Sequence, residues 1–403
     1  MKQTLGALPG RAAAGVQQFF EFEAAGGVLL VLAMLLALVC ANSPWQGYYD
    51  ALISVPVEVR VGALQIAKPL LLWVNDGLMA VFFLLVALEI KREAICGHLA
   101  TREQRVLPLA CAGGGVALPA LVYALLNRDD PAALAGWAIP TATDIAFALG
   151  ILSLLGSRVP LALKVLLSAI AVIDDLAAIV IIATFYTAEL SSAALLGAGG
   201  ALLVLLALNR CGVRRVSAYV LVGVVMWVCV LKSGVHATLA GVATGLFIPL
   251  GDPGDPDDAP LRTLEHALHP WVAYGILPLF AFANAGLNLS GLGWSEAVQP
   301  VPLGIALGLL LGKPIGVFGA AAVVLAMRGA RLPQGITLGA LFGMALLCGI
   351  GFTMALFIGS LAFAPDASYA LAARAGILLG SGAAALLGTL WLLWVLPRTA
   401  ASS

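Results

Sequence analysis

Charged residues are scarce in this sequence. Only 10% of its 403 residues are Asp, Glu, Lys or Arg, 62% are hydrophobic, and the formal net charge is zero. Soluble domains carry about 25% charged residues, so the composition excludes a soluble domain and indicates a membrane protein. The apolar runs are continuous and do not alternate with polar residues, which excludes an outer-membrane β-barrel. The chain is therefore predicted to be an all-α polytopic membrane protein, with no nucleic acid among its partners.

The sequence also lacks a paired-cysteine motif. None of the six cysteines forms a C-x-x-C pair, and most lie inside apolar runs. A disulfide framework or a cysteine metal site would need such clustering, so neither is predicted and no cofactor is expected. We interpret these residues as small packing side chains. They are Cys40, Cys96, Cys111, Cys211, Cys229 and Cys348.

Apolar segments of about 17–25 residues, the length that crosses a bilayer as a helix, recur about twelve times. With the N-terminus in the cytoplasm, the loops on that side hold roughly three times as many Lys and Arg residues as the loops outside, as the positive-inside rule requires. We therefore predict a single transmembrane domain over residues 1–403, with short cytoplasmic tails at both ends. The expected spans are 24–42, 70–90, 106–126, 132–155, 161–186, 192–209, 216–230, 234–250, 268–289, 301–326, 336–363 and 370–396.

The first external loop alternates apolar and polar residues, reading VEVRV before Gly62 and LQIA shortly after it. Alternation with a period of two around a glycine predicts a β-hairpin near residues 54–67; a plain ordered loop is the alternative. An isolated hairpin is marginally stable in water. We therefore expect it to pair with the same element of a second protomer, which would make the protein a homodimer.

Four charged residues lie at the centres of otherwise uncharged spans. Asp174 and Asp175 are adjacent in the middle of the fifth span, Asp144 is central in the fourth, and Lys313 is central in the tenth. Each costs roughly 2.5–3.5 kcal/mol at the centre of a membrane helix, which makes it a functional-site hypothesis by default. A purely structural ion pair is the alternative for Lys313 and its partner, but it leaves the acid of the fourth span unexplained.

The fourth span is predicted to be interrupted. Pro140 removes a backbone donor and clashes with the preceding turn, so the helix should break there and leave unpaired backbone groups at membrane depth. Either Thr141 or Thr143 can then cap the restarting half-helix. Asp144 lies in or beside its first turn, where the helix dipole favours a negative charge.

The eleventh span has a comparable weak point at Gly349 and Gly351. The fourth and eleventh spans are an odd number of crossings apart, so they run in opposite directions. This arrangement predicts two inverted repeats, made of spans three to five and ten to twelve, with crossed, interrupted helices. Interrupted segments at matching positions of inverted halves indicate a transporter site near the bilayer midplane.

The residues of this centre suit an alkali cation. Hard cations prefer oxygen ligands, which carboxylates, threonine hydroxyls and unwound backbone carbonyls supply. Asp174 and Asp175 project about 100° apart around their helix, so one can face a cation while the other faces Lys313. If the same oxygens hold either sodium or protons, alternating access of the site yields antiport without a chemical step.

Several long stretches of the chain are distinctive. They include NDGLMAVFFLLVALEIKRE, GWAIPTATDIAFALG, GSRVPLALKVLLSAIAVIDDLAAI, LKSGVHATLAGV, LGKPIG and CGIGFTMALFIGSLAF. These stretches resemble the bacterial NhaA sodium/proton antiporters, a family of inverted-repeat transporters, and the resemblance covers nearly the whole chain. It implies exchange of sodium, and also of lithium, for protons across the bacterial inner membrane, in an electrogenic and pH-regulated process that serves sodium and pH homeostasis.

The resemblance also implies roles for individual residues. Asp175 would be the principal sodium-binding carboxylate, with Asp174 as the partner of Lys313, while Thr143 and Asp144 would lie at the crossing of the two broken helices. A cytoplasmic pH-sensing region would map onto the ends of spans two and nine. Its residues would be Glu89, Arg92, Glu93, Glu265, His266 and His269.

Other interpretations of the polar residues stay open. The helical spacing of Glu265, His266 and His269 is compatible with a metal site, but the ligands are few and a solvated helix end or a pH-sensitive patch fits better. Asp76 is equally compatible with a structural and a functional role. His236 is more typical of a packed, hydrogen-bonded histidine than of an ion ligand.

Two rival functions use the same features. An intramembrane aspartyl protease also needs acids inside membrane helices. Proteases of that class resemble one another in two motifs, tyrosine-aspartate and glycine-x-glycine-aspartate. Here Thr143 precedes one acid and Ile173 precedes the other, so both signatures are missing and the protein is not expected to be an enzyme. A cation-coupled symporter of an organic solute is the nearer rival.

Overall fold

The computed structural model describes residues 8–62, 64–97, 102–187, 191–251, 259–290, 293–364 and 366–397. The two predicted tails therefore lie largely outside the described residues. The first half of the chain forms α1 Leu8–Ala41, α2 Gln46–Ser54, β1 Pro56–Val61, β2 Leu64–Pro69, α3 Leu70–Trp73, η1 Val74–Leu78, α4 Met79–Cys96, α5 Arg102–Leu126, α6 Pro131–Leu134, η2 Ala135–Thr141, α7 Ile145–Leu154, η3 Gly156–Arg158 and α8 Leu161–Phe185.

The second half is helical throughout its described elements. These are α9 Ser192–Arg210, α10 Val216–Leu231, α11 Thr238–Phe247, α12 Pro260–Trp271, η4 Val272–Ile276, α13 Leu277–Ala285, α14 Trp294–Ala297, α15 Pro300–Leu307, η5 Gly308–Gly312, α16 Lys313–Ala326, α17 Leu338–Cys348, α18 Phe352–Ala362 and α19 Ala367–Val395. Three of the short elements, η1, η4 and η5, are π-helical turns inside longer helices.

The architecture is that of a polytopic membrane protein. Among the described residues, seven helices are long and apolar enough to cross a bilayer, or nine if each of two bent helix pairs counts as one span. The sequence prediction of about twelve spans is larger because it also counted short apolar helices as crossings. The clearest cases are α10 and α11, which fall below the length of a full span.

Helices α5 and α16 approach closely where glycines face each other. A Cβ atom on Gly114 of α5 would lie 2.2 Å from the carbonyl oxygen of Gly316 of α16, and one on Gly316 would lie 2.1 Å from the carbonyl oxygen of Gly114. Such small residues let two backbones touch inside a membrane, where dispersion replaces the hydrophobic effect as the attractive force. This contact fixes the start of α16, and therefore the backbone of Lys313, against α5.

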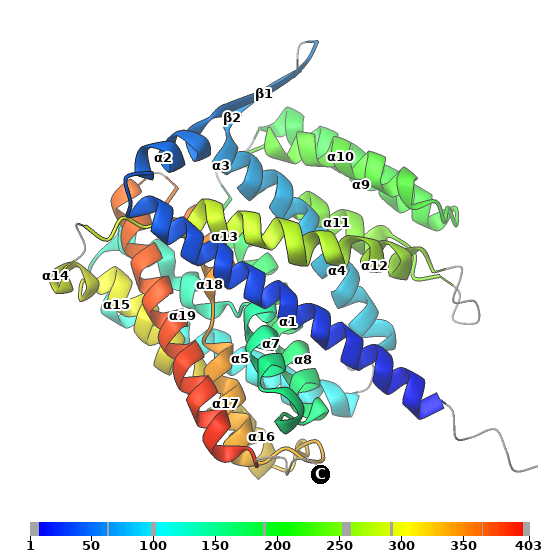
Figure 1. The fold of residues 1–403 in the computed structure, drawn as a ribbon. Helices are drawn as coiled ribbons and strands as arrows, with labels where there is room; N and C mark the ends of the chain where they lie inside the picture. The colour runs from blue at the N-terminus through cyan, green and yellow to red at the C-terminus, as the bar shows by residue number, and fades with distance from the viewer. Residues whose placement is uncertain are drawn as a thin grey trace, which may run out of the picture.

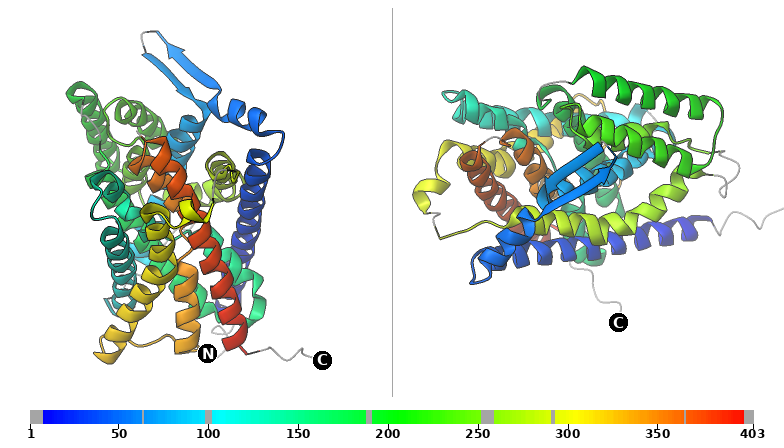
Figure 2. Two further views of the ribbon diagram at one scale, coloured as in Figure 1. Left: turned by 90° about the vertical axis from the view of Figure 1, so that its left-hand side faces the viewer. Right: turned by 90° about the horizontal axis from the view of Figure 1, so that it is seen from above.

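A β-hairpin projects beyond the helices at one end of the bundle (Figure 2). β1 and β2 pair antiparallel, with Val61 opposite Leu64 next to the turn. Gly62 adopts a φ of +60° in that turn, a conformation that glycine reaches without strain. The hairpin is tied to the bundle by Lys232, whose Nζ donates a 2.7 Å hydrogen bond to the carbonyl of Gln65.

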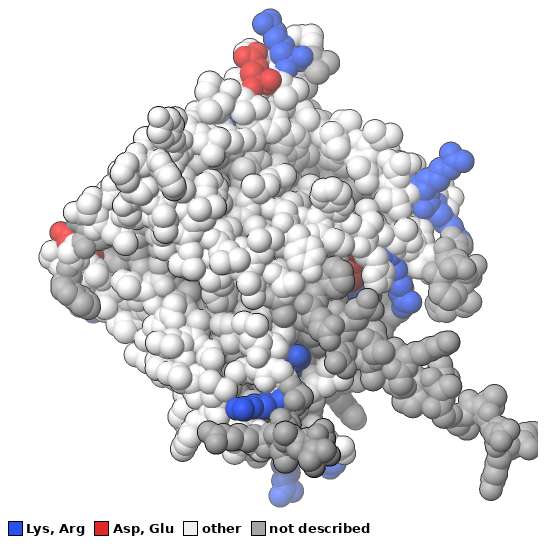
Figure 3. Space-filling view, viewed as in Figure 1, with Lys and Arg blue, Asp and Glu red and all other residues white. Residues whose placement is uncertain are grey.

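The middle of the face shown in Figure 3 carries few charged side chains. Acidic and basic side chains lie at the hairpin, further charged side chains lie toward the left and right edges, and basic side chains lie at the edge opposite the hairpin. Helix α1 begins and α19 ends on the side of the bundle away from the hairpin (Figures 1 and 2). A face with few charged side chains in its middle is the surface that a bilayer requires.

Candidate ion-binding site

The fourth predicted span is interrupted between η2 and α7. Pro140 lies in the 3-10 turn η2, the chain then becomes extended, and α7 begins at Ile145. The expectation that Thr141 or Thr143 caps α7 is wrong. Asp144 is itself the N-cap, because it is the last extended residue and its Oδ1 accepts a 3.0 Å hydrogen bond from the backbone N–H of Phe147.

The second interruption separates α17, which ends at Cys348, from α18, which begins at Phe352. A Cβ atom on Gly349 would lie 2.4 Å from the carbonyl oxygen of Leu309, so only glycine fits this position. Ser381 of α19 caps the new half-helix, because its Oγ accepts hydrogen bonds from the backbone N–H groups of Gly351 and Phe352 at 3.2 and 3.1 Å. The break is therefore supported by neighbouring helices on two sides.

The two interruptions cross at Asp144. Its backbone N–H donates a 2.6 Å hydrogen bond to the carbonyl of Ile350. Its Oδ2 accepts two more bonds from Thr353, one from the backbone N–H at 2.9 Å and one from the hydroxyl at 2.6 Å. A single carboxylate thus caps the N-termini of both α7 and α18. Two helix dipoles point their positive ends at this anion, which stabilises its charge at membrane depth.

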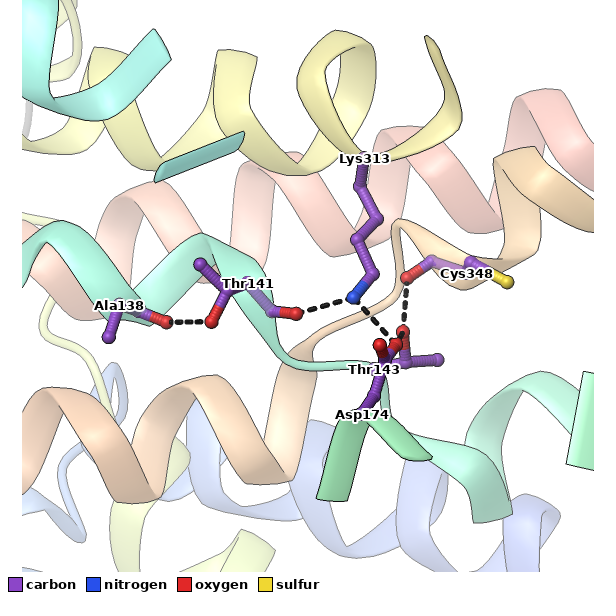
Figure 4. Close-up of polar contacts among 6 residues, drawn as sticks. All are labelled: Ala138, Thr141, Thr143, Asp174, Lys313 and Cys348. Atoms are coloured by element: carbon purple, nitrogen blue, oxygen red, sulfur yellow. Dashed lines mark hydrogen bonds and ion pairs between the residues drawn. The ribbon is translucent and has the colours of Figure 1, made fainter. Parts of the chain in front are cut away.

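Lys313 and Asp174 form an ion pair beside this crossing (Figure 4). The Nζ of Lys313 donates a 2.6 Å hydrogen bond to Oδ2 of Asp174, and it also donates to the backbone carbonyl of Thr141. The lysine side chain is completely buried and Asp174 is 1% exposed. Gly115 on α5 packs tightly against α16, the helix of this lysine, since a Cβ atom there would lie 2.8 Å from Cγ2 of Val317.

Thr143 connects the ion pair to the second interruption. Its Oγ1 lies 2.7 Å from Oδ2 of Asp174 and 2.9 Å from the carbonyl oxygen of Cys348. The hydroxyl has one proton, so it donates to only one of these acceptors at a time. The threonine predicted to cap a helix instead bridges a carboxylate and an unwound carbonyl.

Asp175 has a different environment although it is the next residue. It is 1% exposed, and its Oδ1 has no hydrogen-bond partner among the described residues. Together with Asp144 and Thr353 it lines a cavity of about 50 Å³. One water needs roughly 10–15 Å³, so the cavity has room for a small cation. Buried carboxylate oxygens are normally satisfied, and an unpartnered one on a residue that lines a cavity is available to a ligand.

The cavity extends toward the residues predicted to sense pH. Glu89 and His269 line it with Asp175. Arg92 lies beyond them, with its Nε 2.9 and 3.0 Å from the two carboxylate oxygens of Glu265 and its Nη1 2.7 Å from Oε1 of Glu93. The remaining predicted residue, His266, is exposed on the outer side of α12.

The structure does not gather these residues into a metal centre. Among the described residues, no group of three or more His, Cys, Asp or Glu side chains could hold a metal ion in the manner of a zinc site. Oxygen donors of Asp175, Asp144 and Thr353 line the cavity instead. Carboxylates and hydroxyls of this kind suit hard cations.

Asp76 and His236 do not line this cavity. Asp76 lies in the π turn η1, where its Oδ2 is 2.7 Å from the Nζ of Lys68 at the base of the hairpin. His236 lies between α10 and α11 and hydrogen-bonds through Nε2 to the backbone carbonyl of Tyr186. Both contacts join segments of the bundle.

Two polar residues near the crossing were not predicted from the sequence. Thr353 contributes a hydroxyl to Asp144, and Ser381 caps α18. A signal for the first was present, because Thr353 follows Gly351 by two residues, in the first turn of a restarting half-helix. Nothing local distinguishes Ser381 from other small residues of α19, since its role depends on the packing of two helices.

Comparisons with known proteins agree with this geometry. Residues 17–392 match the family model described as Na+/H+ antiporter 1. A Na+/H+ antiporter NhaA 1 of Pseudomonas putida is 59% identical over 372 residues, which cover 92% of this chain and 94% of that protein. Na+/H+ antiporters NhaA of Aeromonas hydrophila and Serratia proteamaculans are each 54% identical, over 95% of this chain and 96% and 98% of their own lengths. The chain therefore belongs to the Na+/H+ antiporter 1 family.

Proposed function

We propose that this protein is a secondary transporter that exchanges sodium for protons across the bacterial inner membrane. The observation that carries the proposal is Asp175, a buried carboxylate that has an unpartnered oxygen among the described residues and lines a cavity together with Asp144. Membership of the antiporter family supports the same exchange. Lithium is proposed as a second substrate because it is also a hard cation that takes oxygen ligands.

The mechanism uses one set of oxygens for two ligands. Sodium binds to Asp175 with help from Asp174, and its arrival displaces protons because a protonated carboxyl cannot also hold the cation. Asp144 and Thr353 keep the two half-helix ends together around the cation, and Thr143 links them to the ion pair of Asp174 and Lys313. Since two adjacent acids offer more than one proton site against a single cation, we propose that the exchange is electrogenic.

Alternating access follows from the paired interruptions. We propose twelve crossings in a single transmembrane domain, with both termini in the cytoplasm and with inverted repeats made of spans three to five and ten to twelve. The meeting of the α7 and α18 N-termini at Asp144 supports this arrangement. The position of the hairpin, opposite the beginning of α1 and the end of α19, supports it as well (Figure 1). Small movements of the crossing would open the cavity to one side or the other.

We further propose that the Arg92, Glu93 and Glu265 cluster adjusts transport to cytoplasmic pH. The ion pair of Arg92 with Glu265 joins α4 to α12, and Glu89 and His269 of these helices line the cavity of Asp175. Protonation of a carboxylate in the cluster would weaken the contact between the two helices.

The external hairpin is proposed to pair with its copy in a homodimer, because an isolated two-stranded hairpin is only marginally stable.

Reconstitution tests the exchange directly. Purified protein in proteoliposomes, given an imposed sodium gradient, should change the internal pH read by an enclosed dye. The Asp175→Asn variant should abolish this change, while Asp366→Asn, which alters the N-cap of α19 far from the cavity, should retain it. Wild-type exchange by the Asp175→Asn protein would sink the assignment. Proton or sodium movement only when an organic solute is added would favour a symporter.

A further inference from the structure

A second, larger cavity lies at the end of the bundle away from the hairpin. It has a volume of about 900 Å³ and lies between the beginnings of α5 and α8 and the connection from α16 to α17. Cavities of roughly 300–1,000 Å³ hold ligands of substantial size. No residue lines both this groove and the cavity of Asp175. We call it the α5–α8 groove.

The walls and the mouth of the α5–α8 groove differ in chemistry. The walls are apolar and include Leu107 of α5 and Val165 of α8, whereas Arg328 and Arg331 contribute two positive charges from the α16–α17 connection. No acidic side chain is among the described residues that line it. Neither arginine side chain has a hydrogen bond or an ion pair with any described residue, and both residues are exposed. The groove therefore combines unneutralised positive charge with a long apolar surface.

The backbone at the mouth is unusual. Arg328 has a φ of 55° and is the single non-glycine residue with positive φ among those described. It follows the C-cap of α16, and Gly329 donates a 3.0 Å hydrogen bond back to the carbonyl of Val324. Helices commonly end with a left-handed glycine at this position. Here the chain holds an arginine in that strained conformation although a glycine follows directly.

We propose that the α5–α8 groove binds an anionic phospholipid, with its phosphate between Arg328 and Arg331 and an acyl chain along α5 and α8. Charge complementarity argues for the anion, because arginine forks match phosphate oxygens and neither guanidinium has a partner among the described residues. The apolar walls argue for a lipid over free phosphate, which would leave them unoccupied. Basic pockets between membrane helices at a cytoplasmic surface bind anionic lipid headgroups through the same attraction of opposite charges.

The groove adjoins the transport helix. Ala169, which lines it, lies on α8 only five residues before Asp174, or about 7.5 Å along the helix axis. An acyl chain in the groove would therefore pack against the same helix that carries both central carboxylates. Bound lipid would therefore stabilise the position of α8.

Native mass spectrometry of the purified full-length protein tests the proposal. The protein in detergent is titrated with phosphatidylglycerol, with the zwitterionic phosphatidylcholine, and with inorganic phosphate. The double variant R328Q/R331Q should bind phosphatidylglycerol roughly thirty-fold more weakly than the wild type, since each basic residue near an anionic lipid contributes about a factor of five. Ala162→Trp, which fills the apolar wall without changing charge, should weaken retention of the same lipid.

A matched control removes two arginines elsewhere. R60Q/R128Q takes the same charge from the hairpin end of the molecule and should leave phosphatidylglycerol binding unchanged. Equal retention by the wild type and R328Q/R331Q would overturn the proposal. Equal affinity for phosphatidylcholine and phosphatidylglycerol would show that the charge of the headgroup does not matter. Saturation of the site by inorganic phosphate alone, with no effect of Ala162→Trp, would show that the ligand is a free anion and not a lipid.

Discussion

The centre of the bundle and its Arg92 end both contain paired charges, but at different depths. Lys313 is fully buried and Asp174 is 1% exposed, whereas the Arg92 side chain is 30% exposed and its partner Glu265 12%. Breaking a buried pair strands a charge without water, while water compensates a broken pair nearer the surface. The comparison therefore predicts that substitutions at the centre act on exchange itself and on stability, whereas substitutions at the Arg92 end act on the pH dependence of exchange.

The largest effect should come from the central ion pair. Asp174→Asn leaves Lys313 charged and without a buried partner, which costs about 3–5 kcal/mol of folding free energy. Thermal unfolding in detergent should show a large fall in the melting temperature. The double variant Asp174→Asn/Lys313→Gln should recover most of it, because no buried charge remains. A melting temperature of Asp174→Asn equal to that of the wild type would contradict the difference between the centre and the Arg92 end.

Asp144 should give the next largest effect. In Asp144→Asn an amide donor replaces an oxygen that accepts two hydrogen bonds from Thr353, so the fold should lose about 1–3 kcal/mol and sodium affinity should fall. Thr337→Ala removes the ordinary N-cap of α17 as a control. It should cost about 1 kcal/mol and leave the affinity unchanged. Unchanged melting and affinity in the Asp144 variant would show that this residue is a bystander.

The third prediction separates competition at the centre from sensing at the bundle end. Where Asp175 takes up a proton, each unit of falling pH should weaken the apparent sodium affinity about tenfold, or roughly 1.4 kcal/mol, if one proton is displaced per cation. Saturating sodium should restore the rate that competition removes. Sodium dependence of exchange, measured at several pH values in proteoliposomes, checks this.

Glu265→Gln and His266→Gln sharpen the same measurement. Any loss of maximal rate at low pH that sodium cannot restore belongs to a sensor, and it should disappear in these variants if the sensor lies at that helix end. An apparent affinity that does not change with pH would refute competition at the central carboxylates.

The smallest effect should lie outside both clusters, at Asp130. The Tyr369 hydroxyl donates to its Oδ2, and this bond, followed by bonds from the backbone at Ala133 and Ala132, lowers the pKa of Asp130 below its usual 3.8. Because the folded pKa is depressed, the stabilisation is complete above pH 3.8 and is lost as pH falls through the lower folded value. Tyr369→Phe should lower the melting temperature slightly at pH 7, and the difference should shrink under acid. A difference that grows under acid would contradict the sign.

Local signals in the sequence predicted the interruptions well. Pro140 lacks a backbone donor, and Gly349 and Gly351 weaken α17 at its end, so each break has a cause within a few residues. Asp174 and Asp175 were equally visible, because a carboxylate stands out in an apolar run. These features depend on the chain itself and on the cost of burying charge.

Features that depend on tertiary packing were not predictable in the same way. The hydroxyl of Thr353 reaches Asp144 across 209 residues, and Arg92 meets Glu265 across 173. Asp144, and not Thr141 or Thr143, caps α7 because the extended segment after Pro140 continues as far as residue 144. The count of long helices is lower than twelve because the prediction also counted short apolar segments as spans, among them those of α10 and α11.

The π turn η5 gives alignments of related sequences a particular meaning. It occupies Gly308–Gly312, and the next residue is Lys313. A π turn holds one residue more than the α-helix it interrupts. A single deletion here would therefore remove the extra residue and restore a regular α-helix, so that Lys313 keeps its direction relative to α15. In relatives of this protein, a gap of one residue at η5 would leave the central lysine pointing the same way, whereas a gap of one residue within α15 itself would rotate it by about 100°.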